Sequence, residues 1–67
     1  MTPDQLRTAL RELNGQRDTV FYFARAERAV VTNAMLIPDE PDHLVKVTDG
    51  KHVFVIDAES VVWIRIG

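Results

Sequence analysis

Residues 51–66, KHVFVIDAESVVWIRI, are the stretch that decides the fold class of this chain. Two runs of β-branched and aromatic residues, 53–56 (VFVI) and 61–64 (VVWI), flank the polar tetrad 57–60 (DAES). Such runs are typical of buried strands. A tetrad is too short for the crossover helix of a parallel pair and suits a tight corner between strands. The stretch therefore predicts two consecutive strands joined by a sharp turn, as in a small barrel.

The residues just before this stretch predict a β-hairpin. Segments 43–48 and 51–56 flank Asp49-Gly50, a pair that favours a two-residue type I′ turn. That turn would place Thr48 opposite Lys51. Its register predicts one core-facing set of side chains: His43, Val45, Val47, His52, Phe54 and Ile56.

The N-terminal residues predict a single helix over 3–14. Thr2 is a good N-cap, and Gln5 completes a capping box with it. The expected stop is Asn14-Gly15, because glycine readily adopts the left-handed conformation that ends helices. A narrow apolar stripe follows the helical period: Leu6, Leu10 and Leu13.

The remaining segments predict further strands, so that the chain is mainly β with one helix. Aromatic residues favour a strand at 18–24, and 28–37 reads as a longer strand that bends near 32–34. Prolines and acidic residues make 38–42 an exposed loop. In the last strand, 61–66, alternation predicts that one set faces the core, Val62, Ile64 and Ile66, and that the other faces outward, Val61, Trp63 and Arg65.

Length, composition and charge limit the classes of function. A chain of 67 residues makes one domain, 1–67, and its 46% hydrophobic content argues against disorder. Without cysteine it has no disulfide and no thiolate metal site. We find no leader pattern and no apolar run of ~18 residues, so we expect a cytoplasmic protein with no membrane partner. A net charge of −2 lacks the basic excess of a general nucleic-acid binder.

Catalytic constellations are missing from the sequence. Ser60 is the single serine and no glycine flanks it to form a nucleophile elbow. Asp57 and Glu59 are paired in sequence only, which does not define a general acid and base. His43 and His52 would lie roughly 13 Å apart along the predicted ladder, too far to share one zinc ion. We therefore expect no enzymatic activity, no metal and no cofactor.

The order of elements resembles the Sm-like small barrel, a five-stranded, strongly bent barrel that is similar to SH3-like barrels. Residues 54–56, Glu59-Ser60 and 61–64 are similar in spacing to the second Sm motif. The RNA-contact residues of that motif differ, because this chain has Asp57-Ala58 where Sm proteins have Arg-Gly. Where the bacterial Hfq branch has Lys-His, this chain has Ile56-Asp57.

The resemblance implies assembly into oligomers. Sm-like barrels form rings by pairing the fourth strand of one subunit with the fifth strand of the next. Here these strands, 53–56 and 61–66, are the most apolar in the chain, and an exposed apolar edge promotes aggregation unless it is paired. Our leading hypothesis is a non-enzymatic Sm-like interaction module that forms homo-oligomers. The expected interface residues are Val53, Val55, Val61, Trp63 and Arg65.

Two alternatives remain open at this stage. One is an RNA-binding Sm-like ring that uses helix arginines, although the near-neutral charge and Asp57 oppose nucleic-acid binding. Its contact residues would be Arg7, Arg11, Arg17 and Asn33. The other is a small monomeric adaptor that binds one protein partner.

Overall fold

The computed structural model describes residues 1–67 as one α-helix and six strands in two three-stranded antiparallel sheets. The prediction of a mainly β chain with one helix is confirmed. The elements are α1 (Pro3–Leu10), β1 (Thr19–Phe23), β2 (Ala29–Val31), β3 (Met35–Leu36), β4 (Val45–Thr48), β5 (Val53–Ile56), the short 3-10 helix η1 (Ala58–Ser60) and β6 (Val61–Ile66).

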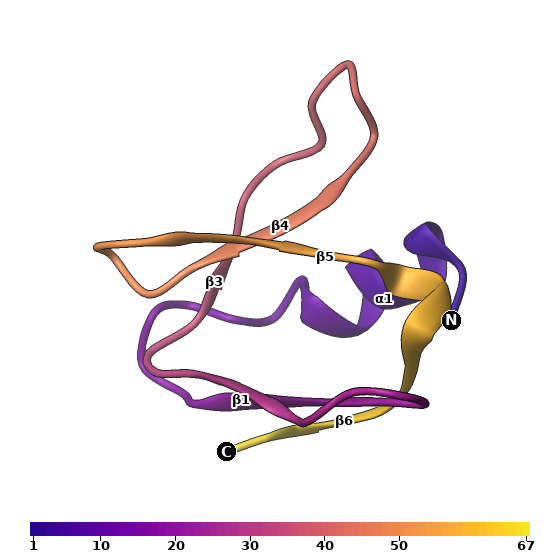
Figure 1. Cartoon of the computed structure of the whole chain (residues 1–67). Coiled ribbons are helices and arrows are strands. Elements are labelled where there is room, and N and C mark those ends of the chain that lie inside the picture. Colours follow the sequence, from indigo (N-terminus) through magenta and orange to yellow (C-terminus); the bar gives the residue numbers. More distant parts are fainter.

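The two sheets form separate layers (Figure 1). Sheet A has the order β2-β1-β6, and sheet B has the order β3-β4-β5. The strand expected at 28–37 divides at the predicted bend, so that β2 belongs to sheet A and β3 to sheet B. Asn33 lies at this corner with a left-handed φ of 49°. Because β5 and β6 do not pair with each other, the sheets do not close, and the predicted five-stranded barrel is not confirmed.

The helix begins as predicted and ends earlier than predicted. Thr2 Oγ1 accepts a hydrogen bond from the backbone N–H of Gln5 at 3.1 Å, and Gln5 Oε1 accepts one from that of Thr2 at 3.0 Å. The last helical residue is Leu10, and the backbone N–H of Leu13 donates to its carbonyl oxygen at 3.1 Å. This turn keeps Leu13 in the core although the helix has already ended.

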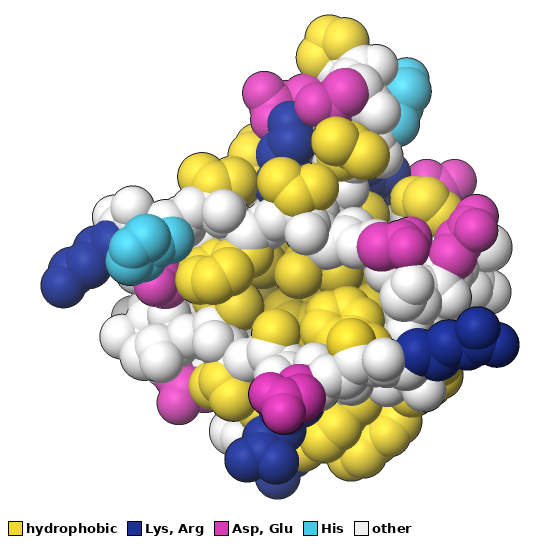
Figure 2. Space-filling model, viewed as in Figure 1, with side chains coloured by type: hydrophobic (Ala, Val, Ile, Leu, Met, Phe, Trp, Pro, Cys, Tyr) yellow, Lys and Arg dark blue, Asp and Glu magenta, His cyan; other side chains and the backbone are white.

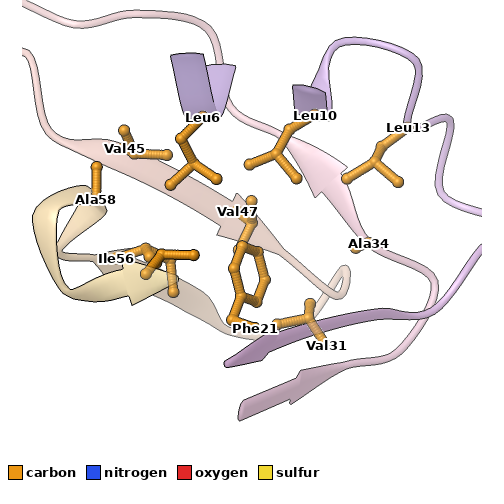
Figure 3. Close-up of a cluster of buried hydrophobic side chains, with 11 residues drawn as sticks. Leu6, Leu10, Leu13, Phe21, Val31, Ala34, Val45, Val47, Ile56 and Ala58 are labelled. Atoms are coloured by element: carbon orange, nitrogen blue, oxygen red, sulfur yellow. The ribbon is translucent and has the colours of Figure 1, made fainter. Parts of the chain in front are cut away.

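The hydrophobic core lies between the two sheets, and α1 covers one side of it (Figure 3). Phe21, in the central strand of sheet A, is completely buried. Val45 and Val47 point toward it from sheet B. The helix side contributes three leucines: Leu6, Leu10 and Leu13. The core thus combines residues of both sheets with residues of the helix and of the turn that follows it.

The β4–β5 hairpin differs from the predicted type I′ turn. Thr48 pairs with Val53, so the loop holds residues 49–52 and the register is shifted by two residues. The cause is Asp49, whose Oδ1 accepts the backbone N–H groups of Lys51 and His52 at 2.8 and 2.7 Å. An even shift preserves the predicted face of the strand residues: Val45, Val47, Phe54 and Ile56. Both histidines lie outside the strands.

A bulge at the start of β6 reverses the predicted alternation. Phe23 pairs with Val61 and Tyr22 pairs with Trp63, so Val62 is an extra residue between the two pairs. A bulge shifts the side-chain phase by one residue. Consequently Val61 is 2% exposed and lies in the core, whereas Val62 is 55% exposed. The prediction that Val62 faces the core and Val61 faces outward was wrong.

The Asp49 loop makes stability depend on acid pH. Hydrogen bonds from the backbone N–H groups of His52 and Lys51 lower the pKa of Asp49 to about 2. Its stabilising contribution is complete above the unfolded pKa of about 3.9 and is lost as pH falls toward 2. We expect Asp49→Ala to lower the urea midpoint clearly at pH 6 and much less at pH 2. Glu12→Ala is the control, at an exposed residue with no ion pair, and it should change the urea midpoint little at either pH. An effect of Asp49→Ala on the midpoint that does not vary with pH would contradict this account.

Candidate interaction surface

The outer strands are β2 and β6 in sheet A and β3 and β5 in sheet B. Of these, β5 and β6 border the same side of the molecule (Figure 1). In β4, the carbonyl oxygen of Lys46 accepts the backbone N–H of Ile37 at 2.9 Å, so it points toward β3. Backbone groups alternate in direction along an antiparallel strand. Val45 and Val47 therefore point toward β5, where they pair with Ile56 and Phe54. Val53 and Val55 alternate with these two residues, so they direct their N–H and C=O groups away from β4, where no partner meets them.

The backbone groups of β6 alternate in the same way. The backbone N–H of Gly67 donates to the carbonyl oxygen of Asp18 at 2.9 Å, so these residues point toward each other across the β1–β6 pair. By alternation, Ile64 and Ile66 direct their backbone groups away from β1. Each of the two edges thus presents two residues with free backbone donors and acceptors. We call these two rows of backbone groups the free edges.

Apolar side chains accompany both free edges. Val53 and Val55 are 59% and 57% exposed. On β6, Trp63 is 52% exposed and stacks on Tyr22 with ring centroids 3.9 Å apart. Figure 2 shows hydrophobic side chains inside a hollow of the viewed face. Several core-facing residues of the outer strands are accordingly only partly buried: Phe54, Ile64 and Ile66.

A pocket of about 310 Å³ lies at the end of β5. It is mainly apolar and is lined by Pro3, His43, Leu44, Val45, Val55, Ile56, Asp57, Ala58 and Glu59. Asp57 caps η1, because its carboxylate accepts the backbone N–H of Glu59 at 3.2 Å and the hydroxyl of Ser60 at 2.8 Å. The Glu59 side chain makes no hydrogen bond or ion pair, whereas the Ser60 hydroxyl is held by the Asp57 carboxylate.

Four of the five predicted interface residues are exposed, and the fifth is not. Val53, Val55, Trp63 and Arg65 are accessible, whereas Val61 packs in the core. The inclusion of Val61 was therefore wrong. Val62 is the exposed residue at this end of β6, and strict alternation gave no signal for it because the bulge depends on pairing with β1.

The arginines expected to contact nucleic acid do not form one surface. Arg7 is only 7% exposed, and its Nη2 lies 3.0 Å from Asp39 Oδ1 and donates to the His43 carbonyl oxygen at 2.6 Å. Arg7 therefore holds the 38–44 loop against the helix, and little of its side chain is exposed for contact with a nucleic acid. The other predicted contacts are exposed: Arg11, Arg17 and Asn33.

The acidic loop, which projects at the top of Figure 1, is held by a second cation. Lys46 Nζ lies 2.7 Å from Glu40 Oε1 and 2.7 Å from Asp42 Oδ2. Hydrogen bonds from Lys46 and from the backbone N–H of Leu44 lower the pKa of Asp42. The same carboxylates raise the pKa of Lys46. These acidic groups are thus engaged by the chain itself.

We expect Arg7→Met to reduce the free energy of unfolding by about 2 kcal/mol, because charged hydrogen bonds of this kind contribute about 1.5–3 kcal/mol. Arg11→Met is the matched control at the C-cap of the same helix, since Arg11 is exposed and has no ion pair. Urea unfolding followed by circular dichroism measures both. Equal stabilities of the two variants would contradict the clamping role of Arg7.

Comparison with protein-family models, with curated proteins and with solved structures gives no match for this chain. No helix in the structure has the length and apolar character needed to cross a membrane.

Proposed function

We propose that this chain is a non-enzymatic, Sm-like small-barrel interaction module whose copies assemble by pairing β5 of one copy with β6 of the next. One observation carries the proposal. The two free edges combine unpaired backbone groups with apolar side chains that are more than half exposed, Val53, Val55 and Trp63. Exposed edges of this kind are templates for pairing with another chain.

The size of the chain supports the same proposal. A domain of this length buries only about 60% of its unfolded surface, and small domains commonly gain stability by oligomerisation. Because β5 and β6 are different surfaces, the contact is head-to-tail, and such contacts close into a ring when the rotation between copies permits. Closure would leave no copy with an unpaired β5 or β6.

The alternative of an RNA-binding ring is weakened by Arg7, which is engaged with Asp39 and the 38–44 loop. It would depend on Arg11 and Arg17 alone. Two phosphate contacts give a salt slope of only about −1.4 on single strands. The adaptor alternative draws on the same free edges, with a foreign strand in place of a second copy.

Light scattering coupled to size exclusion tests the proposal. We expect a mass that is a multiple of 7.6 kDa at micromolar concentration, with an absorbance spectrum free of nucleic acid. A mass of 7.6 kDa over the whole concentration range would overturn the assembly and favour the adaptor.

A further inference from the structure

The pocket at the end of β5 matches an exposed aromatic residue on the other free edge. We infer that Trp63 of one copy fills this pocket in its neighbour, and that the two strands pair in one fixed register. The inference rests on the proposed assembly through β5 and β6. It follows from the direction of the backbone groups, which limits how the two edges can meet.

The register follows from the outward-pointing residues. Every strand pair in the molecule is antiparallel, and we take the pairing between copies to be the same. Residues that face each other in a hydrogen-bonded antiparallel pair exchange two backbone hydrogen bonds. A single register lets both outward residues of each edge find partners. It places Val55 opposite the neighbour's Ile64 and Val53 opposite the neighbour's Ile66.

This register also brings apolar side chains together. Directly opposite residues of an antiparallel pair lie on the same face, with Cβ atoms about 4.5–5.5 Å apart. Ile64 and Ile66 face their own core and are only partly buried, because the side between β5 and β6 is open. Val53 and Val55 of the adjoining copy would cover them. The valines that are exposed in one copy would thus complete the core of the next.

Trp63 then lies opposite Ile56, which lines the pocket. Leu44 and Ala58 supply further apolar surface for the indole ring. A buried indole N–H requires an acceptor, and the Glu59 carboxylate at the pocket has no partner within its own chain. The pocket therefore offers both the apolar contact and the acceptor that Trp63 needs.

Charge does not oppose a second copy at this site. The only charged residue of β6 is the basic Arg65. The pocket is lined by two acidic residues, Asp57 and Glu59. The approach of β6 is therefore not opposed by like charges at these residues.

The first test uses fluorescence, because Trp63 is the only tryptophan in the chain. We expect its emission to shift to longer wavelength on dilution, at the concentration where the mass falls to that of one chain. Trp63→Ala should weaken association at least tenfold, whereas Val30→Ala, at an exposed residue of β2, should leave association unchanged. An oligomer whose emission stays constant through dissociation would overturn the placement of Trp63 while leaving the proposed assembly intact.

The second test is disulfide cross-linking between chains, which is clean because the chain has no cysteine. Val55→Cys mixed with Ile64→Cys should form a mixed dimer rapidly under mild oxidation. Val53→Cys mixed with Ile64→Cys is the control, since it lies out of register by two residues, or about 7 Å. Equal yields from the two mixtures, or dimers of Val55→Cys alone, would overturn the register. A wild-type chain that remains monomeric would overturn the proposed function itself, and this inference with it.

Discussion

Val61→Lys is expected to unfold the chain, whereas Val62→Lys should leave it folded. Val61 is 2% exposed and packs in the core, and the next residue is the extra residue of the bulge, 55% exposed. A lysine without a partner in the core costs several kcal/mol. A domain this small has little stability to spare, since even typical domains unfold at a cost of only about 5–15 kcal/mol. At the exposed position the ammonium group stays in water.

Circular dichroism and thermal unfolding of the two variants measure this difference. The comparison is well controlled, because the substitution is the same and the two residues are adjacent. Strict alternation along 61–66 predicts the opposite result, with Val62→Lys unfolded and Val61→Lys folded. A folded Val61→Lys protein beside an unfolded Val62→Lys protein would therefore show that β6 has no bulge.

Val55→Lys is expected to give a folded chain that no longer assembles. Val55 is 57% exposed, so the monomer tolerates a lysine there. In the proposed assembly the same residue lies against Ile64 of the neighbour, where desolvating the charge costs several kcal/mol. At 1.4 kcal/mol per factor of ten, a cost of about 3 kcal/mol weakens association more than a hundredfold.

Light scattering on Val55→Lys and on Val30→Lys separates this effect from a general effect of charge. Val30 is 52% exposed on β2, away from both proposed free edges, so its variant should keep the wild-type mass. If both variants retain the mass of the wild-type assembly, β5 is not part of the contact. If both dissociate, net charge and not the β5 edge controls association.

Features fixed by local chemistry could be predicted from the sequence. The capping box of Thr2 and Gln5 starts the helix through hydrogen bonds between near neighbours. The aromatic run of β1 and the division of the strand near residues 32–34 also depend on short-range preferences. These predictions needed no knowledge of which segments meet in space.

Features that depend on competing side-chain hydrogen bonds or on distant contacts could not be predicted. The hairpin register changed because the Asp49 side chain accepts two backbone N–H groups, which outweighs the two-residue turn signal of Asp49-Gly50. The bulge in β6 arises only when that strand pairs with β1. Arg7 appeared to be part of a solvated helix face, yet Asp39, far along the chain, pairs with it.

The candidate site was predictable in part for the same reason. Apolar runs identified β5 and β6 as strands with exposed valines and a tryptophan, and the resemblance to Sm-like barrels suggested their role. The pocket is formed by Pro3, Leu44 and residues around η1, which only the folded chain brings together. The unpartnered Glu59 carboxylate beside it carries no recognisable signal in the sequence.

Amide hydrogen exchange at the free edges tests the proposed assembly most directly. The backbone N–H groups of Val53, Val55, Ile64 and Ile66 have no partner within one chain, whereas Phe54 and Ile56 pair with β4 and serve as internal controls. We expect exchange at all four edge amides to be slowed at concentrations where the wild-type chain is assembled, and to be fast in Val55→Lys. Fast exchange at the four edge amides of the wild-type chain, beside protected amides of Phe54 and Ile56, would contradict pairing through β5 and β6.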